Sequence, residues 1–93
     1  MNQRHYSKGE INQFRKHLAE QGVIQKLTLL GCQGIGAIEM RDGAKLRVHT
    51  LPDRRVSAEL KEEIVSLGKA YLGKEFTWAA AIDESIQAPA MKK

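Results

Sequence analysis

The sequence has a single cysteine, Cys32, only two prolines, and 5% aromatic residues. One cysteine cannot form a disulfide within the chain, so a disulfide-stabilised scaffold is excluded and a reducing, cytoplasmic setting is expected. Because aromatic rings are scarce, the core must be built mainly from Leu, Ile, Val and Ala. No apolar run approaches the length that crosses a bilayer, and the polar N-terminus lacks the pattern of a secretion signal.

What is present fits one small folded domain. A chain of 93 residues has no room for a second independent core, so residues 1–93 are expected to form one domain. Apolar residues make up 42% of the chain and charged residues 28%, which is typical of a globular protein and not of a disordered one. Residues 1–6 and 89–93 are expected to be flexible ends.

The net charge of +4 is unevenly distributed. Residues 1–56 carry ten Lys and Arg against five Asp and Glu, a balance of +5, whereas residues 57–93 carry five against six, a balance of −1. Excess positive charge in one half of a chain indicates an anionic partner for that half.

Two helices have clear sequence signals. Ser7-Lys8-Gly9-Glu10 is a capping box, followed by an apolar stripe at helical spacing and by Gly22 as a stop. Ser57 caps a second helix, which ends at Gly73. The two apolar stripes are Ile11, Phe14 and Leu18 in the first helix, and Leu60, Ile64, Leu67 and Tyr71 in the second.

Between these helices the pattern predicts three strands. Residues 23–30 are interpreted as the first, residues 37–40 as the second and residues 44–50 as the third, which alternates strictly between apolar and polar side chains. Asp42-Gly43 is the pair expected to adopt positive φ in a two-residue hairpin turn between the last two strands. The glycine-rich segment 31–36 lacks the Lys-Ser/Thr ending of a phosphate-binding loop and is interpreted as a turn.

The C-terminal segment 74–88 allows two interpretations. Trp78, Ile82 and Ile86 recur at helical spacing, which favours a short third helix closed by Pro89. The alternation of Phe76 and Trp78 fits a short strand instead.

The predicted fold is therefore α+β: a three-stranded antiparallel sheet with two main helices in the order α-β-β-β-α, plus a short C-terminal helix. Over residues 7–72 this order resembles the double-stranded-RNA-binding fold and the HicA-type mRNA interferases. Neither functional motif is present: Gly31-Cys32-Gln33-Gly34 stands where the interferases carry a histidine, and the second helix begins with acidic residues rather than a lysine pair.

The basic side chains predict a nucleic-acid-binding module. Lysines and arginines on one sheet face supply what phosphate contacts need. The candidate residues are Lys45, Arg47, His49, Arg54 and Arg55, with Lys26 on a neighbouring strand and Arg15 and Lys16 on the first helix. Either RNA or DNA fits this pattern.

Two other functions are alternatives. A protein-interaction module, such as a small inhibitor or adaptor, would use an exposed sheet face or edge, including a homodimer, or the helix face of Trp78, Ile82 and Ile86. An endoribonuclease would use His49 as its general base. Catalysis is the less favoured hypothesis because neither His49 nor Cys32 has an acid–base partner nearby in the sequence, and no metal-ligand spacing or cofactor motif is found.

Overall fold

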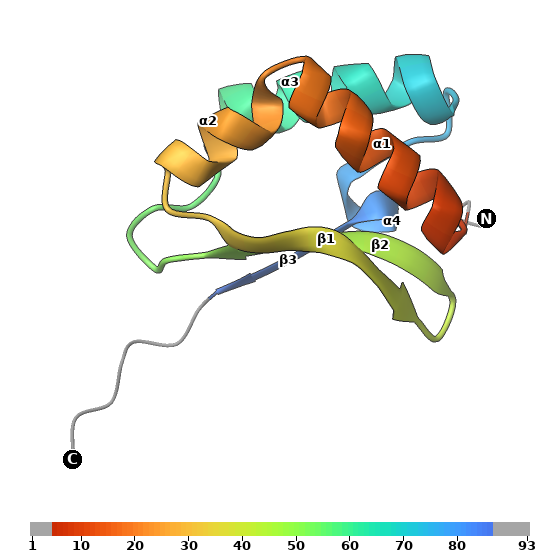
Figure 1. Ribbon diagram of the computed structural model, residues 1–93, viewed down its shortest axis with the longest axis horizontal. Helices are drawn as coiled ribbons and strands as arrows, with labels where there is room; N and C mark the ends of the chain where they lie inside the picture. Colours follow the sequence, from red (N-terminus) through yellow and green to blue (C-terminus); the bar gives the residue numbers. More distant parts are fainter. Residues whose placement is uncertain (1–4, 87–93) are drawn as a thin grey trace.

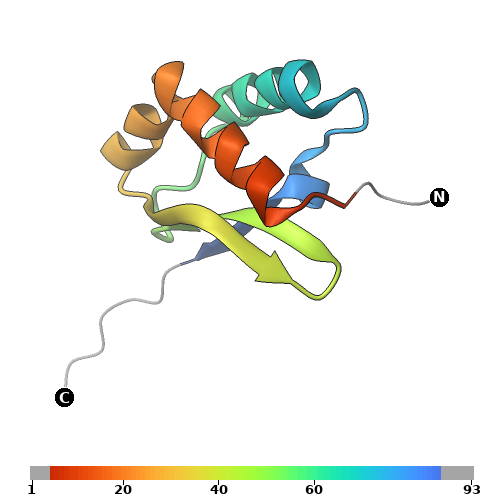
Figure 2. The ribbon, with the colours of Figure 1, turned by 45° about the vertical axis from the view of Figure 1, so that its right-hand side comes forward.

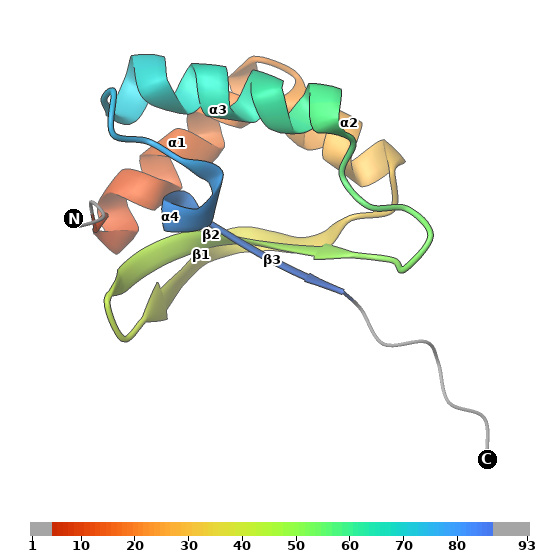
Figure 3. The same ribbon diagram turned by 180° about the vertical axis from the view of Figure 1, so that it is seen from behind.

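The computed structural model describes residues 5–86. Its elements are α1 (Lys8–Glu20), α2 (Val23–Leu29), β1 (Gln33–Met40), β2 (Gly43–Thr50), α3 (Ala58–Leu72), α4 (Trp78–Ala81) and β3 (Ile82–Ile86). The strands form one sheet in the order β1-β2-β3, and the three longer helices lie together over one of its faces (Figure 1). In the view from behind, none of the described residues forms a layer over the opposite face (Figure 3). The predicted α+β class is confirmed.

The caps set the two long helices, as predicted. In α1 the Ser7 hydroxyl accepts from the backbone of Glu10, and the Glu10 carboxylate accepts from the backbone of Ser7. In α3 the Ser57 hydroxyl accepts from the backbone N–H of Leu60 at 3.2 Å. Each such cap stabilises its helix by about 1 kcal/mol because it satisfies a backbone donor that the helix leaves free.

Residues 23–30 form a helix instead of the predicted strand. Gly22, at φ 80°, ends α1 and lets the chain start α2 at once. Val23 and Leu27, one turn apart, are buried, whereas Leu29 is 82% exposed. In a strand Leu27 and Leu29 would have shared one face, so packing of a single pair against α1 overrode the β propensity of this segment.

The sheet is mixed rather than antiparallel. β1 and β2 form the predicted antiparallel hairpin, but β3 lies parallel to β2 on its other side. β1 begins at Gln33, so most of the segment 31–36 is strand and not the predicted turn, and the strand is longer than the predicted residues 37–40. The hairpin turn also differs from the prediction, because Met40 pairs with Gly43 and the turn residues are Arg41 and Asp42. Only Gly43 there has a positive φ, of 126°.

The C-terminal segment forms neither a helix through residue 88 nor a strand at Phe76. α4 has four residues, and Ile82 then takes extended backbone angles and pairs with Leu46 of β2. As a strand, this segment buries the apolar side chain of Ile82 and pairs with backbone groups on the otherwise free edge of β2. These two gains outweigh the preference for a helix that the spacing of the apolar residues indicates. The predicted α-β-β-β-α order, and with it the resemblance in element order, is therefore wrong.

The core lies between the helices and the sheet (Figure 2). At one end, the ring centroid of Phe76 lies 5.2 Å from that of Phe14 and 6.2 Å from that of Tyr6. Tyr6 belongs to this core and its carbonyl accepts from the N–H of Ala44 at 2.7 Å, although residues 1–6 were predicted to be a flexible end. The rest of the two predicted flexible ends, residues 1–4 and 89–93, lies outside the described residues.

Candidate nucleic-acid interface

The central strand β2 sorts its side chains onto the two faces of the sheet. Toward the helices it buries Ala44, Leu46, Val48 and Thr50. Toward the uncovered face it presents Lys45, Arg47 and His49, which we call the cationic row. The pleat of a strand fixes both sets together, so the alternation that builds the core also aligns this row, as the sequence predicts.

The imidazole of His49 is held from both neighbouring strands. Ser85, its partner in the parallel β2–β3 register, places its hydroxyl 2.7 Å from Nδ1. On the β1 side a Cβ atom at Gly34 would come within 2.9 Å of the ring, and the φ of Gly34 is 62°. Glycine is therefore required there, and a ligand would meet Nε2, since Ser85 occupies Nδ1.

Arg47 faces a carboxylate on β3. Its Nε lies 3.6 Å from Oδ2 of Asp83, too far for a hydrogen bond, and the two side chains are 43% and 31% exposed. Such a pair is weak, because solvent screens both charges. An anionic ligand would compete with Asp83 for the guanidinium.

Lys45 begins the cationic row. Its ammonium donates to the carbonyl of Ala79, just inside α4, at 3.0 Å. An ammonium has three donors, so this bond leaves two for a ligand. Among the Lys, Arg, Asp and Glu side chains described on this face, Lys45 and Arg47 carry two positive charges against the one negative charge of Asp83, a balance of +1.

Arg54 and Arg55 follow β2 in the loop before α3 and are exposed. Arg55 does not join the cationic row: its Nε is 3.6 Å from Oε2 of Glu84, whose Oε1 lies 3.4 Å from the ammonium of Lys61. The Glu84 side chain is only 8% exposed and occupies the helix-facing register of β3. Arg54 packs near Gly31, at the link between α2 and β1.

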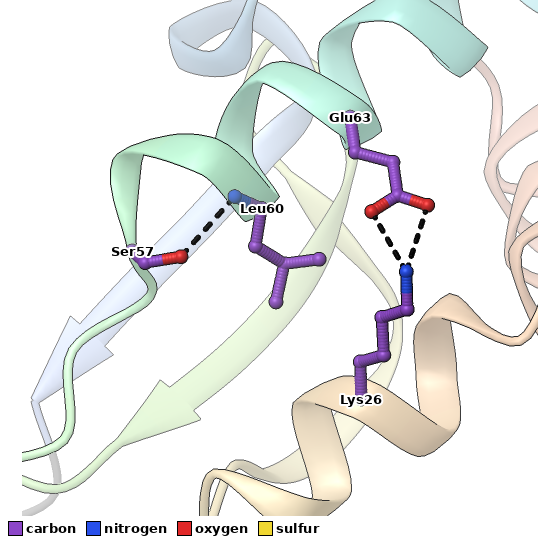
Figure 4. A network of polar contacts seen from close by, with 4 residues as sticks. All are labelled: Lys26, Ser57, Leu60 and Glu63. Carbon is purple, nitrogen blue, oxygen red and sulfur yellow. Dashed lines mark hydrogen bonds and ion pairs between the residues drawn. The ribbon is translucent and has the colours of Figure 1, made fainter.

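The remaining predicted cations lie in the helical layer, on the opposite side of the sheet from the cationic row. Arg15 and Lys16 belong to α1. Lys26 lies on α2 and not on the predicted strand. Its ammonium donates to both carboxylate oxygens of Glu63 in α3, at 3.0 and 3.1 Å (Figure 4). Of the eight predicted contact residues, the fold thus aligns three on one uncovered face.

The predicted apolar face of Trp78, Ile82 and Ile86 does not form. Ile82 is 4% exposed in the core, and Ile86, 50% exposed, lies at the end of β3. Trp78 is half-buried, with the ammonium of Lys61 5.3 Å from its ring centroid. These side chains no longer share a helix face because the helix ends at Ala81.

Within residues 5–86, no cluster of three or more His, Cys, Asp or Glu side chains could hold a metal ion. Cys32 is buried at 4% exposure, and this burial, with a smaller effect of the Glu84 charge, raises the pKa of its thiol. A neutral, enclosed thiol is a poor nucleophile. No helix among the described residues is long and apolar enough to span a membrane.

The sequence does not indicate Asp83 and Ser85 as residues of this face. Both face the cationic row because β3 pairs in parallel with β2, and a segment interpreted as a helix gives no reason to place them there. Three consecutive polar residues separate Ile82 from Ile86, so the segment shows no period-2 alternation that would have indicated a strand.

No protein-family model matches the chain, and comparison with curated proteins and with solved structures finds no similar protein. Chemically, the alternation of β2 directs a lysine, an arginine and a histidine toward the uncovered face, with the lysine ammonium bonded to the carbonyl of Ala79. Consecutive members are about 6.8 Å apart along a strand, so the row spans about 14 Å.

Proposed function

We propose that the protein binds nucleic acid through the uncovered face of its sheet, with Lys45 and Arg47 contacting phosphates and His49 beside them. The observation that supports this most is the alignment of the three side chains on the central strand, with no described element over them. At an axial rise of about 3.4 Å per nucleotide of one duplex strand, a row of about 14 Å covers about four nucleotides. Few phosphate contacts imply weak, salt-sensitive binding, with a Kd of about 10⁻⁴ M at physiological salt.

Fluorescence anisotropy with labelled RNA and DNA oligonucleotides, single-stranded and duplex, tests the proposal. For a single strand, two phosphate contacts predict a slope of log K against log[salt] of about −1.4. Lys45→Gln and Arg47→Gln should each lower affinity and reduce this slope by about 0.7, because each removes one counterion-releasing contact.

Two further variants make this test specific to the face. Asp83→Asn should tighten binding, because it removes the carboxylate that competes for Arg47 while keeping the side-chain shape. Lys16→Gln, which removes the same charge from the helical layer, should leave affinity nearly unchanged. Equal losses for Lys16→Gln and Lys45→Gln, or no binding at low salt, would overturn the proposal.

A second candidate is cleavage of RNA, favoured by the 2.7 Å contact between His49 and Ser85. With Nδ1 engaged, Nε2 of His49 would accept the proton of a ribose 2′-hydroxyl as that oxygen attacks the adjacent phosphorus. The bond from phosphorus to the 5′ oxygen of the next nucleotide would break, and that oxygen would take a proton from solvent. The attacked nucleotide would be left with a 2′,3′-cyclic phosphate. Arg47 would hold the phosphate oxygens.

Gel analysis of a labelled RNA incubated with purified protein tests this second candidate. His49→Gln should remove cleavage while leaving phosphate binding in place, and Ser85→Ala should lower the rate by about 10-fold or more through loss of imidazole orientation. A DNA strand of the same sequence should remain intact, because it has no 2′-hydroxyl. Cleavage that persists in His49→Gln would assign the activity to a contaminant.

A further inference from the structure

The two edges of the sheet differ in how well they are protected from pairing. β3 carries Asp83 and Glu84 among five residues, a composition typical of guarded edges. β1 is longer, contains neither lysine nor proline, and has Glu39 as its one charge. None of the described residues pairs with the outer edge of β1 (Figures 1 and 2).

The backbone groups that β1 turns outward can be identified from the hairpin. The N–H of Ala44 donates away from β1, to the carbonyl of Tyr6, so the pair Glu39–Ala44 exchanges no ladder hydrogen bonds. The N–H and C=O of Glu39 therefore point outward, and those of Ala37 do so by alternation. With respect to residues 5–86, two sites of the ladder stand open on this edge.

We propose that β1 pairs antiparallel with β1 of a second copy, about a two-fold axis at Ala37, to form a continuous six-stranded sheet. In this register the two Ala37 residues exchange both of their free hydrogen bonds. Ala37 is small, so the helix-facing side of the axis carries no bulky side chain.

The side chains on the uncovered face favour a second copy over an unrelated peptide. Paired residues point to the same face, so Ile38 of each copy lies over Gly36 of the other. Both positions are on the uncovered face, opposite Lys45 and Arg47 respectively. A Cβ built on Gly36 has no atom within 4 Å, so there is room for the isoleucine. The segment is thus complementary to itself, a large residue meeting a glycine on each side of the axis.

The symmetry has a consequence for the face described above. A two-fold axis normal to the sheet keeps both uncovered faces on the same side, so two cationic rows would lie on one surface. This consequence rests on the proposed nucleic-acid function, whereas the dimer itself does not depend on it.

Sedimentation velocity of the full chain over a concentration series, without nucleic acid, tests the pairing. The wild-type mass should rise toward twice that of the monomer. Gly36→Val should weaken dimerisation about 10-fold or more, because the added side chain collides with Ile38 of the second copy at two symmetric places. The monomer of the Gly36→Val variant should remain folded, as measured by circular dichroism, because the space around Gly36 is open and the φ of this residue is not positive.

A compensating swap separates this register from other interfaces. Ile38→Ala alone should weaken the dimer, whereas Gly36→Val combined with Ile38→Ala should restore it by exchanging the large and small positions. Ile86→Ala, on the opposite edge, should leave the mass unchanged. A protein that stays monomeric at every concentration, or a dimer unaffected by Gly36→Val, would overturn the proposal and leave the edge of β1 to an extended peptide of another protein.

Discussion

Replacing Phe76 by alanine should lower the free energy of unfolding by about 3–5 kcal/mol, the usual cost of removing a fully buried ring. Phe76 is 0% exposed and lies 5.2 Å from the ring of Phe14 and 6.2 Å from that of Tyr6. It follows α3 and reaches back under it, so its ring joins the C-terminal segment to α1. For 93 residues a stability of about 5–14 kcal/mol is expected, so the loss is a large part of the total.

Urea denaturation followed by circular dichroism measures this loss. Tyr71→Ala is the matched control: its ring stacks on His17 at 4.6 Å but is 44% exposed, so about 1 kcal/mol is expected. If the two variants lost equal stability, Phe76 would not be the packing centre of that end of the core.

Replacing Gly68 by alanine should destabilise the protein by about 2 kcal/mol, although alanine is the better helix former. A Cβ on Gly68 would come within 2.5 Å of three ring atoms of Phe76. Because that ring is buried, it cannot move aside, and overpacking of this kind costs about 3 kcal/mol at the upper end of its range. The higher helix propensity of alanine returns about 1 kcal/mol.

The same substitution at Gly9 is the control. Gly9 is exposed in the first turn of α1, and a Cβ built there meets only the Ser7 hydroxyl, at 3.9 Å. Gly9→Ala should therefore stabilise the protein by up to about 1 kcal/mol, the opposite sign. Combining Gly68→Ala with Phe76→Ala should cost less than the sum of the two, because the second change removes the collision. Additive losses would show that Gly68 does not act through Phe76.

The cationic row is the part of the candidate site that the sequence could predict. Lys45, Arg47 and His49 alternate with buried apolar residues on one strand, and local period alone places them together. Arg55 and Lys26 could not be assigned in this way, because their carboxylate partners Glu84 and Glu63 come from elements distant in the chain. Whether a surface cation is free for a ligand depends on such partners.

The sequence by itself determined α1, α3 and the hairpin of β1 and β2. In the two helices the caps and the apolar period agree, and in the hairpin the strict alternation of β2 fixes the strand, although the turn lies one residue earlier than predicted, so local energetics suffice. Only the tertiary structure decided that residues 23–29 are helical and that residues 82–86 form the parallel third strand. Both segments are short and apolar enough for either conformation. The conformation is decided by which side chains each segment buries in the core: Val23 and Leu27 from the helix, and Ile82, paired with Leu46, from the strand.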